Sequence, residues 1–320
     1  MISVLLTPGG SGMAVTAIKA LRKHSDVRIV ATDIDELSPG LHMADTGYIV
    51  PPFDNDEYMN AILEIVERED IDVVVPALDP ILKRFAADRA DFADYDAAVL
   101  VSPPETLDIT QDKWKTYQHL TEILPLPQSW NNVDDVDGDG EYFVKPRGGS
   151  GSEDIHRVTS RTELEFYCER VSNPIIQDYL PGNEYTIDCL TDRNGALLAC
   201  VPRLRKEITS GISTKVEVVE NEQLVNLAQC VAGELTFTGP FFVQAKVDKN
   251  GVLRVIEIGA RIAGTMCQEF VNPSLQYLSI LQLTGKQVPE PTVNFGSQVS
   301  RYWDEQYFNE GEQFNELTRW

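Results

Sequence analysis

The chain has 320 residues, of which 42% are hydrophobic, and its 27 Lys and Arg against 50 Asp and Glu give a formal net charge of −23. This length accommodates two or three packed units. So acidic a surface repels nucleic-acid backbones and anionic lipid, so we expect neither as a partner. No apolar run reaches the roughly 20 residues of a membrane span. Five cysteines without a C-x-x-C pair indicate reduced thiols, and the start of the chain lacks the basic region of a signal peptide, so we expect a cytoplasmic protein.

Strands and helices alternate along the first third of the chain. Short apolar runs at residues 3–6 and 27–32, and a β-branched run at 71–75, predict buried parallel strands. Helical periodicity at 13–22 lies between the first two. This alternation predicts a doubly wound parallel sheet, an α/β unit that we place at residues 1–108.

The remainder of the chain predicts an α+β fold in two parts. Residues 109–180 combine a helix, a strand at 142–144 and a glycine-rich loop, and we assign them to a central subdomain. Residues 181–320 are rich in strands, and 241–247 with 252–258 form a predicted hairpin across the turn sequence DKNG.

The glycine-rich loop follows directly on the strand at 142–144, which ends by delivering Lys145. Glycines at 148, 149 and 151 allow backbone N–H groups to turn toward a phosphate, and the lysine supplies a cation. The P-loop pattern G-x-x-x-x-G-K-[ST] is absent from the sequence. The alternative is a plain turn beside a surface lysine.

The predicted hairpin carries a second candidate site. Gln244 and Glu257 fall at opposed positions of its two strands, and an amide oxygen with a carboxylate are hard ligands that suit Mg²⁺. Arg261, four residues further on, can contact a phosphate bidentately. The alternative is a surface pair beside a solvated arginine, which the apolar flanking residues disfavour because a charge in apolar surroundings needs a partner.

A third segment, 177–186, reads as a strand, a kink and a new strand. Such an extended hinge offers its own N–H and C=O groups to the edge of a base, and Glu184 just after the turn can accept hydrogen bonds from ribose hydroxyls. An ordinary linker with an exposed acid is the alternative.

Taken together, these segments resemble the ATP-grasp superfamily, most of all a single module of the carbamoyl-phosphate synthase large-subunit type. The motifs that carry the resemblance are VKPRGGSGS, IIQDYLPGNEYTID and FFVQAKVDKNGVLRVIEIGARIAG, in this order. The segments ATDIDELSPGLHMADTGYIVP and IDVVVPALDPIL resemble the domain that precedes ATP-grasp modules. The resemblance implies an ATP-grasp fold with a pre-ATP-grasp domain at 1–108, a central subdomain at 109–180, and a C-terminal subdomain with the metal site at 181–320.

The resemblance also implies roles for individual residues, with ATP and Mg²⁺ as cofactors and Mn²⁺ as an alternative metal. Lys145 and Arg261 become the catalytic residues, the first on the phosphates and the second on the transferred phosphate. The other implied contacts are Lys113 and the loop Gly148, Gly149, Ser150 and Gly151 with the phosphates, the backbone of Gln177 and Tyr179 with adenine, Glu184 with ribose, and Gln244 and Glu257 with the metal.

Two features depart from this pattern or lie outside it. The family has an asparagine two residues after the metal-binding glutamate, and this chain has Gly259, so a second metal ligand is missing. A basic cluster in an otherwise acidic chain is a candidate for holding an anionic substrate, or else a solvated strand end. Its members are Arg203, Arg205, Lys206 and Lys215.

The implied reaction is a carboxylate–amine or carboxylate–thiol ligation through an acyl phosphate. The expected partners are a small carboxylate and an amine or similar nucleophile, and the family's habit makes a homodimer the expected assembly. A non-catalytic nucleotide-binding or scaffold module is the alternative, with Gly259 as a sign of lost activity.

Two further hypotheses come from short motifs. Gly10-x-Gly12-x-x-Val15 after a strand, with Asp33 at the end of the next strand, nearly meets the dinucleotide-binding fingerprint of NAD enzymes, although Val15 replaces the third glycine. Asp135-x-Asp137-x-Asp139-Gly140 matches the first half of a calcium loop, but the position of the bidentate glutamate is a proline. A solvated loop explains that acidic segment better.

Overall fold

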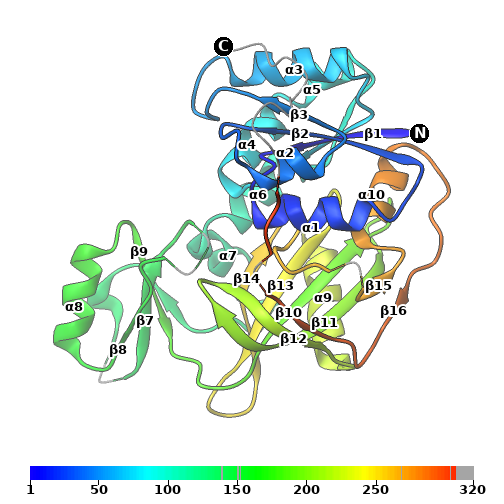
Figure 1. Ribbon diagram of the computed structural model, residues 1–320. Helices are drawn as coiled ribbons and strands as arrows, with labels where there is room; N and C mark the ends of the chain where they lie inside the picture. Colours follow the sequence, from blue (N-terminus) through cyan, green and yellow to red (C-terminus); the bar gives the residue numbers. More distant parts are fainter. Residues whose placement is uncertain (138–139, 150, 152, 268, 303, 308–320) are drawn as a thin grey trace.

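The computed structural model describes residues 1–137, 140–149, 151, 153–267, 269–302 and 304–307. The described residues form three larger sheets (Figure 1): a parallel sheet near the N-terminus, a small sheet that stands apart, and a large antiparallel sheet beneath the first. A fourth sheet has only two antiparallel strands, β15 and β16. Within the described residues, no helix combines the length and the apolar character that crossing a membrane requires.

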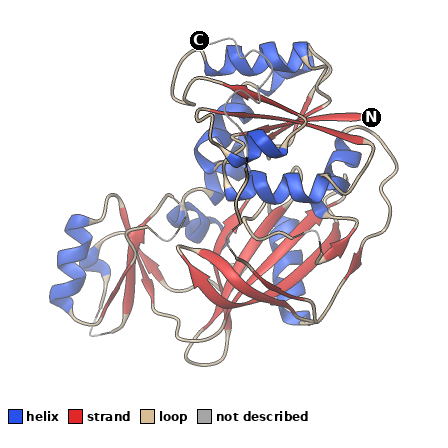
Figure 2. Cartoon of the chain, viewed as in Figure 1, coloured by secondary structure: helices blue, strands red, loops and turns tan. Residues whose placement is uncertain are grey.

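The N-terminal domain contains the predicted doubly wound parallel sheet. Its strand order is β3-β2-β1-β4-β5, and every neighbouring pair is parallel. Its central strands are buried nearly throughout, because helices cover both faces (Figure 2). The elements are β1 (Ile2–Thr7), α1 (Gly12–Leu21), β2 (Val27–Asp33), α2 (Pro39–Met43), β3 (Thr46–Ile49), α3 (Tyr58–Arg68), β4 (Val73–Pro76), α4 (Asp79–Ala87), α5 (Arg89–Ala93), β5 (Ala98–Val99) and α6 (Pro104–Thr110).

The central subdomain is a four-stranded antiparallel sheet of order β6-β9-β7-β8, with α8 packed on one face. It has a small core of its own, built around Val144, Leu164 and Ile176. A separate core lets this subdomain stand away from the rest of the molecule. Its elements are α7 (Lys113–Leu120), β6 (Ser129–Trp130), the 3₁₀ turn Val133–Asp135, β7 (Tyr142–Pro146), β8 (His156–Val158), α8 (Arg161–Arg170) and β9 (Pro174–Asp178).

The C-terminal subdomain is a six-stranded antiparallel sheet of order β14-β13-β10-β11-β12-β17. The predicted hairpin is confirmed as β13 and β14, and Gln244 lies directly opposite Glu257. Its elements are β10 (Glu184–Thr191), β11 (Leu197–Thr209), β12 (Ile212–Val218), α9 (Glu222–Glu234), β13 (Phe241–Val247), β14 (Leu253–Gly259), β15 (Val271–Asn272), α10 (Leu275–Leu283), β16 (Thr292–Val293) and β17 (Gln298–Ser300).

The N-terminal domain and the C-terminal subdomain share their cores. Ile18 of α1 belongs to the same buried cluster as Leu278 of α10, and the ring of His24 stacks on Tyr277 at 3.5 Å. The Thr106 hydroxyl donates to the carbonyl oxygen of Thr236 at 2.7 Å. These two units therefore form one continuous body, and the central subdomain faces it across a cavity.

Candidate active site

A cavity of about 730 Å³ lies between the three units and receives side chains from each of them. Among its described lining residues, cations outnumber carboxylates, the reverse of the chain as a whole. A cavity with that balance attracts an anionic ligand into a protein that otherwise repels it. The cations are Lys113, Lys145, Arg203, Arg205, Lys246 and Arg261, and the acids are Glu153, Asp178, Glu184 and Glu257.

One row of side chains crosses four strands of the large sheet. Arg203 lies opposite Thr186, Thr186 opposite Gln244, and Gln244 opposite Glu257. Directly opposed residues in antiparallel strands project from the same face of a sheet. All four positions line the cavity, so the register of β11, β10, β13 and β14 brings the two predicted metal ligands together.

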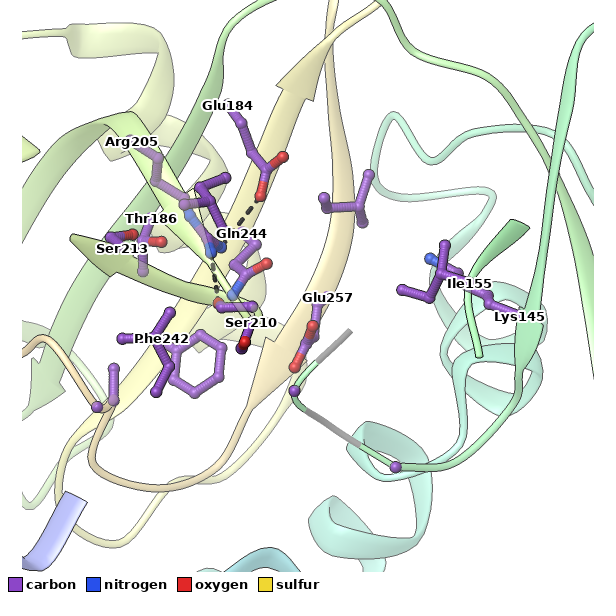
Figure 3. A pocket seen from close by; sticks show the side chains of 18 of the residues that line it. Lys145, Ile155, Glu184, Thr186, Arg205, Ser210, Ser213, Phe242, Gln244 and Glu257 are labelled. Carbon is purple, nitrogen blue, oxygen red and sulfur yellow. Dashed lines mark hydrogen bonds and ion pairs between the residues drawn. The ribbon is translucent and has the colours of Figure 1, made fainter. Parts of the chain in front are cut away.

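A second row lies two residues further along. Glu184 Oε1 lies 3.0 Å from Arg205 Nη1, and Glu184 Oε2 lies 3.3 Å from Lys246 Nζ. Arg205 Nη2 also donates to the carbonyl oxygen of Gly211 at 2.6 Å, and Figure 3 shows Arg205 and Glu184 joined above Gln244. The Glu184 carboxylate is therefore fixed by two cations, and its remaining lone pairs are free to accept from hydroxyl groups.

Lys145 reaches the cavity from the opposite side, at the end of β7, and faces Gln244 and Glu257 across it (Figure 3). Burial of its ammonium group, with the nearby charge of Lys113, lowers the pKa of Lys145 to about 7, although Glu257 and Glu184 act in the other direction. A buried cation with too little negative charge around it gains most from an incoming anion.

Lys113 is tied to the glycine-rich loop. It is the first residue of α7, whose N-cap Asp112 also binds Arg147 through two hydrogen bonds of 3.1 and 2.7 Å. The Lys113 ammonium donates to the carbonyl oxygen of Gly149 at 3.1 Å. Gly148, Gly149 and Gly151 line the cavity as expected for a phosphate loop, and the predicted Ser150 lies outside the described residues.

The hinge corrects the sequence prediction by one residue. Gln177 lines the cavity, but Tyr179 does not, and the Tyr179 N–H donates to the carbonyl oxygen of Glu141 at 3.0 Å. Leu180, the next residue, lines the cavity, and its N–H has no acceptor among the described residues. Gln177, Asp178 and Leu180 of this kinked segment line the cavity and Tyr179 does not, so the N–H of Leu180 and not that of Tyr179 is left available at the cavity.

The predicted metal-binding pair of Gln244 and Glu257 supplies too few ligands for a complete ion site. In the part of the chain that the structure describes, no group of three or more His, Cys, Asp or Glu side chains converges. Mg²⁺ commonly takes only one or two carboxylates from a protein and the rest of its ligands from substrate phosphates and water. The two oxygens present here fit that mode of binding.

Arg261 lines the cavity as predicted, but it has a partner that the sequence did not reveal. Its Nε and Nη2 donate to the two oxygens of Asp79 at 2.5 and 2.6 Å. Burial alone would lower the pKa of the Arg261 guanidinium, and the Asp79 carboxylate outweighs it and raises that pKa. An Asp-Pro pair at a helix start is an ordinary capping signal, so nothing in the sequence pointed from Asp79 to Arg261.

The basic cluster proposed for an anionic substrate does not stay together. Arg203 is 1% exposed and binds Asp188 through two hydrogen bonds of 2.6 and 2.8 Å. Lys206 pairs with Glu217 and Lys215 with Glu207, and neither lysine lines the cavity. Asp188 therefore holds Arg203 at the cavity wall, where its Nη1 has no hydrogen-bond partner among the described residues. The role of Arg203 and Arg205 toward an anionic substrate stays a prediction.

In the segment that resembles a dinucleotide-binding fingerprint, Asp33 hydrogen-bonds to its own glycine loop. Asp33 Oδ2 accepts hydrogen bonds from the Gly10 N–H at 2.7 Å and from the Ser38 hydroxyl at 2.9 Å. The carboxylate that would bind a ribose in an NAD enzyme thus stabilises its own glycine loop. The calcium hypothesis depends on Asp139, which lies outside the described residues.

The comparison with known families agrees with this geometry. Residues 170–304 match the model described as ATP-grasp in the biosynthetic pathway with Ter operon, and residues 4–100 match the PylC-like N-terminal domain. The chain belongs to the ATP-grasp superfamily and has its fold, as the motifs predicted. The narrower likeness to carbamoyl-phosphate synthase stays a prediction.

The proteins that are similar to this chain include several different enzymes. The chain is 27% identical over 96 residues to a D-alanine–D-alanine ligase of Fusobacterium nucleatum, a match that covers 30% of this chain and only 33% of that relative. At 16% identity it superposes on N5-carboxyaminoimidazole synthetase of Staphylococcus aureus complexed with ADP, with a TM-score of 0.72 over 91% of this chain and 80% of the other. The biotin carboxylase domain dimer of Hydrogenobacter thermophilus 2-oxoglutarate carboxylase, in complex with MgADP, ADP and bicarbonate, also gives 16% identity and 0.72, over 92% and 73%.

Proposed function

We propose that this protein is an ATP-dependent ligase that activates a small carboxylate as an acyl phosphate for attack by an amine or a thiol. The observation that carries the proposal is the convergence of Lys113 and Lys145 with Gln244 and Glu257 on one cavity. Two structurally similar proteins, which are complexes with ADP or MgADP, support a nucleotide in this cavity.

The nucleotide would lie between the central subdomain and the large sheet. Its base would meet the Leu180 N–H and the backbone of Gln177, and its ribose hydroxyls would donate to Glu184. The phosphates would meet the ammonium groups of Lys113 and Lys145 and the N–H groups of the glycine-rich loop. Clustered N–H groups and cations of this kind are how proteins bind phosphate without covalent contact.

Gln244 and Glu257 would hold Mg²⁺, or Mn²⁺ in its place, against the phosphates. The ion would neutralise phosphate oxygens and fix their orientation. Phosphoryl transfer needs charge neutralisation and alignment far more than covalent help. Arg261 would stabilise the negative charge on the phosphoryl group as it moves.

The reaction balances without a further reagent. A carboxylate oxygen of the substrate attacks the γ-phosphorus, the bond from the γ-phosphorus to the β–γ bridging oxygen breaks, and ADP leaves with that electron pair. The amine or thiol then attacks the acyl carbon and expels inorganic phosphate, and its proton passes to solvent. Between the two steps the acyl phosphate must be shielded from water.

The substrates would lie on the side of the cavity nearest the N-terminal domain. Ser11, Gly12 and Met13 at the start of α1 line that side, and Gly264 is bonded there through the Thr16 hydroxyl at 3.0 Å. Nucleotide and substrate would then occupy different regions of the cavity.

The test is a screen for ADP release with small carboxylates, each with and without amines and thiols. The unaltered protein should release ADP with at least one pair, and Glu257→Gln, which keeps the side-chain shape but removes the charge, should not. Nucleotide binding without ADP release under every pair would instead indicate a non-catalytic nucleotide-binding module. Light scattering of the same preparation tests the predicted homodimer.

A further inference from the structure

Three neighbouring groups hold the guanidinium of Arg261 in place. Asp79 takes one edge through Nε and Nη2, and Nη1 donates to the carbonyl oxygen of Ile262 at 3.1 Å. The ring of Phe242 covers one face, with the guanidinium carbon 5.1 Å from the ring centroid. Of the five N–H groups of this arginine, one on Nη1 and one on Nη2 have no acceptor among the described residues.

Asp79 brings the N-terminal domain into the site. It is the first residue of α4, where the partial positive charge of a helix N-terminus stabilises a carboxylate. Its carbonyl oxygen accepts from the Gln111 side chain at 2.9 Å, and Leu78 before it lines the cavity. Asp79, which lies 182 residues before Arg261 in the sequence, thus ties the guanidinium to the N-terminal domain.

Phe242 occupies space that Gly259 leaves open. The two residues are opposite one another in β13 and β14. A Cβ atom at position 259 would come within 2.2 Å of the Cε1 and Cζ atoms of the Phe242 ring. Any side chain at 259 therefore displaces the ring, and the glycine found where the family has asparagine is the condition for this aromatic contact.

We infer that Asp79 and Phe242 are positioning residues, which hold Arg261 by edge and by face so that its two free N–H groups meet the transferred phosphate. The inference rests on the proposed function, because it assigns that phosphate to Arg261. An unrestrained arginine side chain loses about 2 kcal/mol of rotamer entropy when it is fixed, and here the fold has fixed it before the ligand arrives. The N-terminal domain would then contribute to phosphoryl transfer without touching the nucleotide.

The experiment compares two nucleotides that differ in the terminal phosphate. The affinities of ADP and of the non-hydrolysable β,γ-imido triphosphate are measured by calorimetry with Mg²⁺ for the unaltered protein and for Asp79→Asn. The variant should bind ADP within about twofold of the unaltered protein and bind the triphosphate about tenfold more weakly, because a displaced guanidinium loses only the terminal phosphate. Asp108→Asn is the matched control, since Asp108 pairs with Lys83 and Lys115 in exposed positions outside the cavity.

A double-mutant cycle separates positioning from a direct effect of the charge. If Asp79 acts through Arg261, Asp79→Asn should change nothing further in a protein that already carries Arg261→Ala. Additive losses would overturn the inference, and so would an Asp79→Asn variant that keeps its triphosphate affinity. If the unaltered protein bound neither nucleotide, the proposed function and the positioning role would fall together.

The aromatic side of the arrangement has its own test. Gly259→Ala should weaken triphosphate binding as Phe242→Ala does, because its Cβ displaces the ring. In a protein that already carries Phe242→Ala, Gly259→Ala should have no further effect, since the space is then free. A Gly259→Ala protein with unchanged triphosphate affinity, or a Phe242→Ala protein that binds the triphosphate normally, would contradict this role for the ring.

Discussion

The two walls of the cavity handle charge differently. On the wall formed by the large sheet, each lining cation is paired before any ligand arrives: Arg203 with Asp188, Arg205 and Lys246 with Glu184, and Arg261 with Asp79. On the wall formed by the central subdomain, Lys113 reaches only a carbonyl oxygen, and Lys145 has no ion-pair partner among the described residues. One wall is assembled in advance, and the other depends on the anion to complete it.

The largest effect should come from breaking the deepest pair of the sheet wall. Asp188→Ala leaves the guanidinium of Arg203 buried and unpaired, a loss that typically costs about 3–5 kcal/mol. We expect the free energy of unfolding, measured in urea, to fall by that amount. Asp108→Ala, which removes an exposed carboxylate, should stay within about 0.5 kcal/mol of the unaltered protein. Equal effects of the two variants would show that the buried pair of Arg203 and Asp188 stabilises the sheet wall no more than an exposed carboxylate does.

Removing a cation from the wall formed by the central subdomain should lower activity without lowering stability. Lys145→Ala should lower the rate of ADP formation by about 10²–10³, equivalent to about 3–4 kcal/mol of transition-state stabilisation. Its thermal midpoint should not fall, because the variant removes a poorly solvated cation that lacks a partner. The exposed Lys115, which pairs with Asp108, supplies the control Lys115→Ala. A Lys145→Ala protein with normal turnover would remove Lys145 from the mechanism.

Glu184 should show an intermediate effect, because it belongs to a pair and also faces the ligand. Glu184→Gln weakens one hydrogen-bond acceptor for ribose, worth about 1 kcal/mol or a fivefold change in nucleotide affinity. The unaltered protein should prefer ATP over 2′-deoxy-ATP, and the variant should lose much of that preference. If both proteins discriminate equally, the ribose is held elsewhere.

The smallest expected effect is the uptake of a proton by Lys145 when the nucleotide binds. Because the pKa of Lys145 is lowered to about 7 in the ligand-free cavity, its amine is largely neutral at pH 8, and bound phosphate should restore the ammonium form. Calorimetry in buffers of different ionisation enthalpy should detect proton uptake on nucleotide binding, and Lys145→Ala should abolish it. The same shift means that the unfolded chain binds more protons than the folded one between about pH 7 and the ordinary lysine value of 10.5. The stability of the ligand-free protein should therefore rise with pH across that window.

Sequence patterns predicted whatever depends on local periodicity or on strand register. The parallel sheet follows from continuous β-branched runs, and the hairpin follows from its turn sequence. The direct opposition of Gln244 and Glu257 also depends on a one-residue register shift between Gln244 and Ala245, without which Gln244 would lie opposite Ile256. At the hinge the prediction differs from the structure by one residue, because Leu180 lines the cavity and Tyr179 does not. A kink in the backbone decides which of the two turns inward, and no residue type encodes that choice. Asp79 and Arg261 could not be joined from sequence at all, since their contact depends on how two units pack.

The residues of the predicted basic cluster lie on different faces of the sheet for a related reason. Arg203, Arg205, Lys206 and Lys215 are neighbours in sequence, but alternation along β11 sends the two arginines to the cavity face and Lys206 to the other. Arg203 then meets Asp188, which sequence analysis had no reason to single out. Gly259 was noticed only as a missing ligand, whereas the structure shows that it leaves room for the Phe242 ring.

The central claim is that a metal-bound nucleotide lies between the two walls, with Glu257 on one and Lys145 on the other. The most direct measurement is the affinity of ADP with and without Mg²⁺, for the unaltered protein and for Glu257→Gln. We predict that Mg²⁺ tightens ADP binding to the unaltered protein by at least about tenfold and has little effect on the variant. An equal response of both proteins to Mg²⁺, or no ADP binding by the unaltered protein, would contradict the account.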